Sequence, residues 1–303
     1  MTNRNSNIGP KNVSKNFNLA IGDVAILQAV QQFRFLRREH LSLLTGRDPK
    51  RVHRRLLKLV QNGLLSTTRL PQQKHIYSIG RAGRAVLVGE GIIVGDLPGL
   101  RLRVHELKEL FLKHEMLIVD HHVLLVLAGK TSTLRLVDWR EGRDIFDTVT
   151  ITDSAGVRKL PVRPDAFFTI EDTLRDQERN RFHFFLEVDR STMPHIRLRE
   201  KLHAYWRYRE QGLHANKFGI QSFRVLTVTL TEARARNLRN LAKTILPEGA
   251  RKNFLFASAD SYSFQEPSGV FGNICFSARD TDPRGAHPLV PQTEHALANR
   301  ARA

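Results

Sequence analysis

Hydrophobic and polar positions follow a helical period between Asp48 and Gly63. One face of this predicted helix is apolar: Val52, Leu56, Leu59 and Val60. The other faces are strongly basic and carry Lys50, Arg51, Arg54, Arg55 and Lys58. Asp48 suits the N-cap, and Pro49 suits the first helical position because its missing N–H would be unpaired there anyway. The pattern predicts a capped helix that packs on one side and presents guanidinium groups on the other.

The sequence around this helix predicts a group of further short elements. Apolar periodicity and β-prone runs define them. They are helices over residues 23–33 and 37–44, a hairpin formed by 64–69 and 75–79, and a closing helix over 81–89. The tripeptide Thr45-Gly46-Arg47 forms a tight link between the second helix and the basic helix. Three helices with a glycine-containing turn before the third are typical of a helix-turn-helix.

With the hairpin added, residues 18–90 have the pattern of a winged helix-turn-helix DNA-binding domain. The basic helix would enter the major groove, and its arginines are candidates for base-edge contacts. The predicted DNA-contacting residues are Lys50, Arg51, Arg54, Arg55 and Lys58 on the helix and Arg69 and Lys74 near the hairpin tip. The alternative is a basic surface helix that is only exposed to solvent.

The positive charge of the chain is concentrated in this region. The sequence has 303 residues and a formal net charge of +18. Residues 1–90 hold 16 Lys and Arg against 4 Asp and Glu, a net charge of +12. Such a local surplus favours salt-dependent binding to a polyanion, and double-stranded DNA is the expected partner. An anionic membrane is the alternative, but the sequence has no apolar run of about 18 residues, so we expect no membrane partner.

Cysteine content and polar segments restrict the class of protein further. The single cysteine, Cys275, excludes an intramolecular disulfide and a cysteine-based zinc site. The first residues lack the apolar core of a signal peptide, so we expect a cytoplasmic protein. Polar composition predicts a disordered basic N-terminus over residues 1–17 and a largely disordered tail over 263–303. Three glycines and a proline in residues 91–101 predict a linker.

Residues 102–262 predict a second domain with a central sheet. Its predicted helices are 102–128, which can also be two shorter ones, 196–211, and 232–246 with Thr231 as its cap. Its predicted strands are 134–139, 145–152, 163–170, 182–189, 223–229 and 254–257. This alternation of helices and strands predicts a mixed α/β fold.

Three acidic residues in this domain are candidates for a metal site: Asp165, Glu187 and Asp189. Glu187 and Asp189 are two positions apart in an apolar strand, so their side chains share a face. If the strand after Asp165 lies beside it, the three anions converge and either raise a pKa or hold a divalent cation. Mg²⁺ or Mn²⁺ would suit these oxygen ligands and could activate water. The alternative is that Asp165 caps a turn and the other two form ion pairs with Arg190, Arg197, Arg199 or Lys201.

The order Pro164-Asp165, hairpin, Glu187-x-Asp189 and a helix with Lys201 resembles the PD-(D/E)XK nuclease superfamily. More narrowly, residues 20–245 resemble the bacterial replication-relaxation family, which occurs on plasmids and other mobile elements. The matching segments are LLTGRDPKRVHRRLLKLVQNGLL, HELKELFLKHEM, RPDAFF, FFLEVDRST, KLHAYWRY and FGIQSFRVLTVT. The resemblance implies a restriction-endonuclease-like domain with an α-β-β-β-α-β core.

The resemblance also implies roles for individual residues. Asp165 and Glu187 match the two metal-binding acids, but Asp189 occupies the position of the motif lysine. Because that lysine polarises the attacking water or stabilises the transition-state oxyanion, its absence argues against hydrolysis. Lys201 could replace it from the next helix, and Glu115 could add a further carboxylate. The alternatives are a solvated helix lysine and a surface ion pair.

Two functions from different classes follow. The first is a DNA-binding protein of a plasmid or other mobile element, acting in replication, relaxation or mobilisation, with a non-catalytic nuclease-like domain. The second is a Mg²⁺-dependent DNA endonuclease that uses Asp165, Glu187 and Asp189 with help from Lys201. The family resemblance adds a relaxase or a replication initiator as a protein partner, and winged-helix proteins often act as homodimers.

Overall fold

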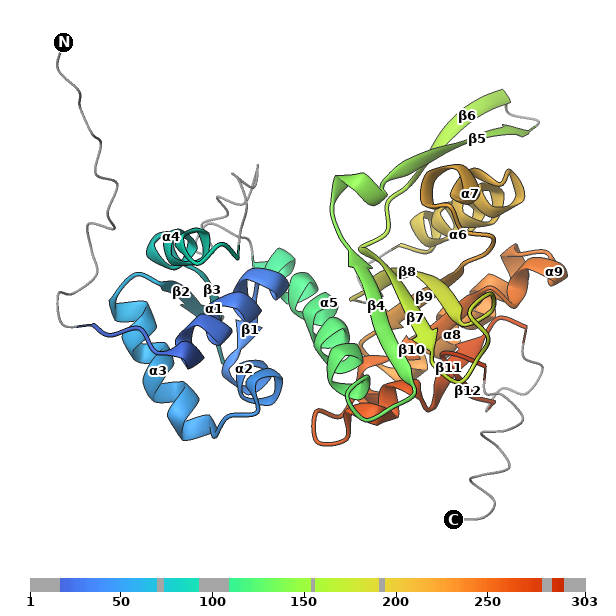
Figure 1. Ribbon diagram of the computed structural model, residues 1–303. Helices are drawn as coiled ribbons and strands as arrows, with labels where there is room; N and C mark the ends of the chain where they lie inside the picture. The colour runs from blue at the N-terminus through green and yellow to red at the C-terminus, as the bar shows by residue number, and fades with distance from the viewer. Residues whose placement is uncertain are drawn as a thin grey trace, which may run out of the picture. The chain divides into compact units, whose positions relative to one another are not determined.

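The computed structural model describes residues 17–69, 74–92, 109–153, 156–190, 194–279 and 285–291. The chain divides into two compact units, Met1–Val123 and Leu124–Ala303 (Figure 1). An N-terminal helical region is followed by a mixed α/β domain, as predicted. The predicted N-terminal segment 1–17 and linker 91–101 lie almost wholly outside the described residues. No helix in the described ranges is both long enough and apolar enough to cross a membrane.

The first unit contains helices and a small antiparallel sheet of order β1-β3-β2. Its helices are α1 (Ile21–Phe33), α2 (Arg38–Thr45), α3 (Pro49–Gln61), α4 (Arg81–Gly89) and the first part of α5 (Glu109–Ala128). Its strands are β1 (Leu36–Arg37), β2 (Leu65–Arg69) and β3 (His75–Ile79). The predicted helices and hairpin are confirmed, with ends shifted by no more than two residues.

The turn between α2 and α3 depends on Gly46. This residue has a φ of +65°, a left-handed conformation that glycine adopts without steric cost. Its N–H donates to the Ser42 carbonyl and closes the end of α2. The turn directs α3 so that Val52, Leu56 and Leu59 are buried, and the opposite side of the helix faces solvent.

Helix α5 is attached to α1 and α2 through charged contacts. Asp120 accepts two hydrogen bonds of 3.1 Å from Arg37 Nη1, and His40 Nε2 lies 3.1 Å from the same carboxylate. Glu115 lies 3.2 Å from Arg34. Glu115 therefore contributes to the packing of the first unit, in line with the ion-pair alternative for this residue.

The second unit is built on a seven-stranded mixed sheet of order β12-β11-β10-β9-β8-β7-β4. The strands are β4 (Leu134–Arg140), β7 (Ala166–Asp172), β8 (Arg181–Asp189), β9 (Arg224–Thr229), β10 (Phe254–Ser258), β11 (Asn273–Ser277) and β12 (His287–Pro288), and a separate hairpin contains β5 (Asp147–Asp153) and β6 (Gly156–Val162). Strands β8, β9 and β10 are parallel, and the other neighbours are antiparallel. The helices are α6 (His195–Glu210), α7 (Leu213–Phe218), α8 (Glu232–Ile245) and α9 (Glu248–Arg251).

The core of this unit lies between the sheet, α6, α8 and the β5–β6 hairpin. Phe185 on β8 is fully buried, and its ring contacts those of Tyr205, Tyr208 and Phe223. The aromatic pairs hold α6 against the face of β8 that also carries the predicted acids.

The C-terminal region differs from the prediction. Residues 263–279 were included in a largely disordered tail, but β11 pairs antiparallel with β10 and buries Cys275 and Phe276. β11 is short and follows polar and glycine-containing residues, so the sequence pattern did not predict it. The strand is stabilised by pairing with β10. Strand β6 and helix α7 also lay outside the predicted elements.

Candidate functional site

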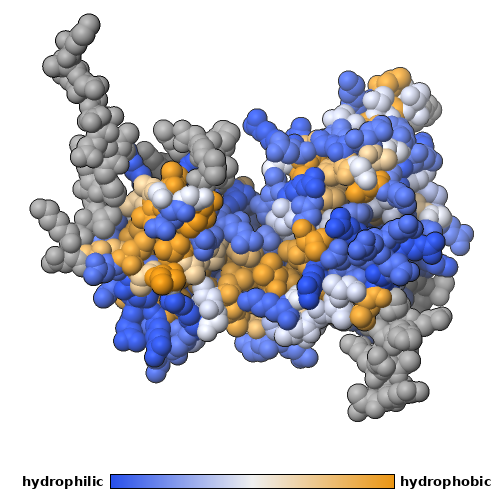
Figure 2. Space-filling view, in the orientation of Figure 1, coloured by the Kyte–Doolittle hydropathy of each residue, from blue (hydrophilic) through white to orange (hydrophobic). Residues whose placement is uncertain are grey.

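Helix α3 presents an uninterrupted exposed face. Its residues recur at helical spacing and are exposed: Lys50, Arg51, His53, Arg54, Leu57, Lys58 and Gln61. Asp48 caps the helix, as predicted, because its Oδ1 accepts a 2.9 Å hydrogen bond from the Arg51 N–H. Figure 2 shows a hydrophilic surface over the lower part of α3 as drawn in Figure 1. Cap and packing thus fix the direction in which the basic side chains project.

Arg55 has a different environment from the other basic residues of α3. Its Nε donates a 2.7 Å hydrogen bond to Oδ1 of Asp23, and its Nη2 contacts Oδ2 of the same residue. Asp23 is fully buried, and the guanidinium also lies over the ring of Phe17. The prediction that Arg55 is available for DNA is therefore not supported by its position: its guanidinium neutralises a buried carboxylate between α1 and α3.

The two predicted basic residues of the hairpin are the last residue of β2 and the residue directly before β3. Arg69 is exposed at the last position of β2. Lys74 is also exposed, and its Nζ lies 3.1 Å from Glu39 on α2. An exposed ion pair of this kind adds little to the stability of the protein. Lys74 can therefore leave Glu39 and bind another anion, such as a phosphate, with little loss of free energy.

The three predicted acids lie close together at one end of β8. Asp165 precedes β7, and its Oδ2 accepts a 2.7 Å hydrogen bond from the Val188 N–H. Glu187 contacts Lys201 Nζ on α6 and accepts a 2.5 Å hydrogen bond from the Tyr205 hydroxyl. Among the alternatives for its ion pair, Lys201 is therefore the partner of Glu187. We call Asp165, Glu187, Asp189, Lys201, Tyr205 and Arg234 the acidic cluster.

Asp189 has a partner that the sequence did not indicate. Arg234 Nε donates a 2.8 Å hydrogen bond to Asp189 Oδ2. Asp189 is opposite Thr229 in the parallel β8–β9 register, and Thr231 caps α8 through the Arg234 N–H. The first turn of α8 therefore begins beside the end of β8, which the spacing of the elements alone does not predict.

Burial controls the electrostatics of the acidic cluster. The pKa of Glu187 is raised from 4.5 to about 7, because burial, helped by the charge of Asp165, outweighs the opposing Lys201 ammonium and the Tyr205 hydroxyl. Burial lowers the pKa of Lys201, but Glu187 and Asp165 raise it by more, so the net shift is upward. Burial and Glu187 also raise the pKa of Tyr205, which keeps its hydroxyl protonated as a donor.

The contacts of these acids do not form an open set of metal ligands. Both carboxylate oxygens of Glu187 have a donor, and Asp189 Oδ2 has Arg234. Asp189 Oδ1 is buried and has no hydrogen-bond partner among the residues that the structure describes. Within the described ranges, no group of three or more His, Cys, Asp or Glu is placed to hold a metal ion. Lys201 and Arg234 supply the positive charge that a metal cation would otherwise supply. Binding of Mg²⁺ or Mn²⁺ stays a prediction.

The fold and these two groups of residues define a two-unit protein with a basic helix in one unit and a buried acidic cluster in the other. The model of the replication-relaxation family matches residues 27–222, more than half of the chain. The chain belongs to the replication-relaxation family, which points to a role in replication or relaxation. The match spans α3 and the acidic cluster up to Tyr205. Comparisons with curated proteins and with solved structures gave no match.

Proposed function

We propose that this protein binds double-stranded DNA and acts in the replication, relaxation or mobilisation of a plasmid or another mobile element. The first unit would be a winged helix-turn-helix, with α3 as the recognition helix. The observation that carries the proposal is the exposed face of α3. Four of its basic side chains have no ion-pair partner among the described residues: Lys50, Arg51, Arg54 and Lys58.

The chemistry of this face fits a major groove. Arginine can donate two hydrogen bonds to guanine, and lysine neutralises phosphates without base preference. Leu57 is half exposed on the same face, and an apolar side chain there can contact a thymine methyl group. Arg69 and Lys74 on the hairpin would contact the phosphates beside the groove. These roles support sequence-specific recognition rather than charge attraction alone.

The α/β unit would then be a nuclease-like module that makes DNA or protein contacts without cutting. The ion pairs of Glu187 with Lys201 and of Asp189 with Arg234 support this non-catalytic role. A buried carboxylate whose charge is already neutralised by an ammonium or guanidinium group attracts a metal cation less strongly.

The test begins by selecting binding sites for the full chain from random double-stranded DNA. Affinity for the selected site is then measured by fluorescence anisotropy for wild type, Arg51→Ala and Arg54→Ala. Loss of a bidentate guanine contact should cost about 1–3 kcal/mol and relax the preference at one base pair. Arg199→Ala, which removes an exposed arginine from α6, is the matched control. Unchanged affinity and salt dependence in both α3 variants would refute the proposal.

A metal-dependent DNA endonuclease is the second candidate function. The observation that favours it is the proximity of Asp165, Glu187 and Lys201, which would let Lys201 take the role of the superfamily's lysine. The test is Mg²⁺- or Mn²⁺-dependent cleavage of supercoiled plasmid by wild type, Glu187→Ala and Glu200→Ala. Nicked product that disappears only in Glu187→Ala would establish the nuclease. No cleavage by a wild-type protein that binds DNA would exclude it.

A relaxase or replication initiator as partner, and a homodimer on two half-sites, complete the proposal. Winged-helix proteins bind paired half-sites about one helical turn apart when they dimerise. Analytical ultracentrifugation of the protein with its selected site gives the stoichiometry. Two copies on a palindromic site would support the homodimer, and one copy would exclude it.

A further inference from the structure

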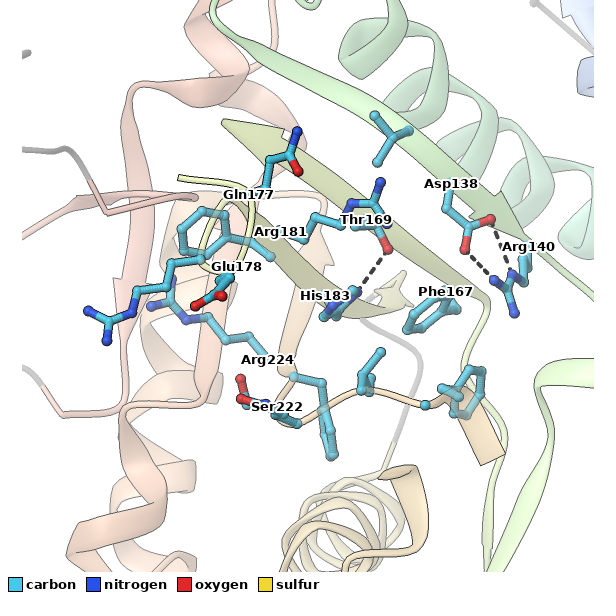
Figure 3. A pocket seen from close by; sticks show the side chains of 18 residues that line it. Asp138, Arg140, Phe167, Thr169, Gln177, Glu178, Arg181, His183, Ser222 and Arg224 are labelled. Carbon is cyan, nitrogen blue, oxygen red and sulfur yellow. Dashed lines mark hydrogen bonds and ion pairs between the residues drawn. The ribbon is translucent and has the colours of Figure 1, made fainter. Parts of the chain in front are cut away.

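A cavity of about 760 Å³ lies in the α/β unit, apart from the acidic cluster. It is formed by β4, β7, β8, the connection between β7 and β8, and the segment from Phe218 to Arg224. Figure 3 shows His183 and Phe167 side by side at its centre, with Asp138 and Arg140 at one end and Glu178 and Arg224 at the other. Its volume is in the range of sites that bind small organic molecules.

The cavity has an excess of positive charge. Four arginines and two acids line it: Arg140, Arg179, Arg181, Arg224, Asp138 and Glu178. Asp138 is neutralised by Arg140 at 2.7 Å. Among the described residues, the one ion pair of Arg181 is a long contact of 3.4 Å with Glu171, which is outside the cavity. This leaves more guanidinium groups than carboxylates inside the cavity.

Arg224 is the most informative of these cations. It is partly buried and donates a 3.1 Å hydrogen bond to the Leu289 carbonyl, with no carboxylate partner among the described residues. Burial is the main cause that lowers its pKa; Cys275 opposes this effect, and the nearby Arg175 and Arg209 add to it. An enclosed guanidinium among like charges is costly, and an anionic ligand would remove that cost.

The centre of the cavity offers a flat, uncharged ring. The imidazole of His183 is parallel to the ring of Phe167 within 10°, and Phe218 stacks on Phe167 at 4.7 Å. Thr169 Oγ1 lies 2.9 Å from His183 Nδ1 and fixes the orientation of the ring. Burial and Arg181 lower the pKa of His183, so the imidazole is neutral at pH 7. A neutral aromatic face of this kind can stack with a nucleobase.

We propose that this cavity binds one nucleotide unit, with its base against His183 and its phosphate near Arg181 and Arg224. A small inorganic anion would leave the aromatic face unused, and an apolar ligand would leave the arginines unpaired. The side chains of Gln177, Gln221 and Ser222 at the wall can donate to and accept from the edges of a base. The nucleotide can be free or an unpaired nucleotide of single-stranded DNA. All lining residues belong to the α/β unit, so the proposal does not depend on duplex recognition by α3.

The test measures binding of three probes to the full chain by isothermal titration calorimetry. The probes are inorganic phosphate, thymidine monophosphate and a 5′-phosphorylated tetrathymidylate. Both nucleotide probes should bind at least tenfold more tightly than phosphate. A tenfold preference for the tetranucleotide assigns the site to single-stranded DNA, and equal affinities assign it to a free nucleotide.

Variants locate the site. Arg181→Gln and Arg224→Gln should each weaken nucleotide binding about tenfold, and His183→Ala should weaken it at least fivefold through lost stacking. His183→Phe keeps a ring and should retain most of the affinity. Arg199→Gln on α6 is the matched charge control, and Arg51→Ala should leave binding of thymidine monophosphate unchanged while it weakens duplex binding.

The readouts separate folding from binding. Both tryptophans, Trp139 and Trp206, belong to the α/β unit, so their fluorescence reports whether each variant is folded. Folded wild type that binds neither nucleotide probe at millimolar concentration would overturn the proposal. So would phosphate binding as tight as that of thymidine monophosphate, or equal weakening by Arg199→Gln and the cavity variants.

Discussion

Arg54 and Arg55 are adjacent on α3 but have opposite surroundings. Arg54 is exposed, whereas Arg55 pairs with the fully buried Asp23. The helical spacing predicts that both are on the DNA-facing side, because it defines a face only to within one residue. It could not identify the partner of Arg55, which is 32 residues away in the chain and is brought close by packing of α1 on α3.

This difference predicts opposite effects of the two alanine substitutions. Arg55→Ala should lower the free energy of unfolding by about 3 kcal/mol, because it leaves a buried carboxylate without its cation. Arg54→Ala should leave stability unchanged and weaken binding to DNA. Thermal unfolding by circular dichroism and anisotropy with duplex DNA measure the two effects. Equal stability of both variants would contradict the assigned role of Arg55.

Glu187 should make the stability of the α/β unit depend on pH. Its folded pKa of about 7 lies above its usual value of 4.5, so the folded state holds the proton more tightly. The resulting stabilisation is complete below about pH 4.5 and is lost as the pH rises through about 7. A shift of this size corresponds to about 3 kcal/mol as an upper bound.

The measurement is urea unfolding at pH 5 and pH 8, followed by tryptophan fluorescence. Wild type should lose more stability between the two values than Glu187→Gln, because glutamine does not titrate. The subtraction also removes contributions from the 13 histidines that both proteins share. The same pH dependence in both proteins would mean that Lys201 keeps Glu187 ionised throughout.

At the scale of the element, the N-cap of α3 links stability to orientation. Asp48→Ala removes the hydrogen bond to the Arg51 N–H and should cost about 1 kcal/mol. Asp48→Asn keeps a capping oxygen and should retain stability. Hydrogen exchange of the α3 amides, followed by mass spectrometry, distinguishes the two. Unchanged exchange in Asp48→Ala would show that the cap does not control this helix, and faster exchange in both variants would show that the carboxylate charge of Asp48 is needed.

The helices and strands that the sequence predicted have a clear local pattern, and those that it did not predict depend on tertiary partners. Strands with clear apolar runs and helices with a strong period, such as α3 and β8, were predicted to within two residues. β6 carries a proline and mostly exposed residues, and it forms by pairing with β5. α7 has six residues between Gly212 and Gly219, too few to show a helical period. Elements that depend on tertiary partners carry little local signal.

The same limit applies to the acidic cluster. The spacing of Glu187 and Asp189 correctly placed both on one face of β8, and the order of strands brought Asp165 beside them. The cations that neutralise them come from two different helices, α6 and α8. Because α8 follows a separate strand, no local pattern could have assigned Arg234 to Asp189.

At the scale of the whole molecule, the distribution of charge predicts where DNA affinity originates. Residues 1–90 hold +12 of the net +18, so counterion release on duplex binding should come mainly from the first unit. Each phosphate contact contributes about 0.9 to the slope of log affinity against log salt concentration. Lys50→Gln and Lys58→Gln should therefore each lower that slope by about 1.

Lys252→Gln provides the matched control, since Lys252 is an exposed lysine in the α/β unit. For this variant, the slope of log affinity against log salt concentration should equal that of wild type. Affinity for duplex DNA is measured between about 50 and 200 mM salt, where the release of counterions from phosphates gives a strong salt dependence. If all three lysine variants lower the slope equally, the duplex contacts both units, and α3 is one part of a larger basic surface. If only the α3 variants lower it, duplex binding depends on the first unit, and the α/β unit remains available for the nucleotide proposed for its cavity.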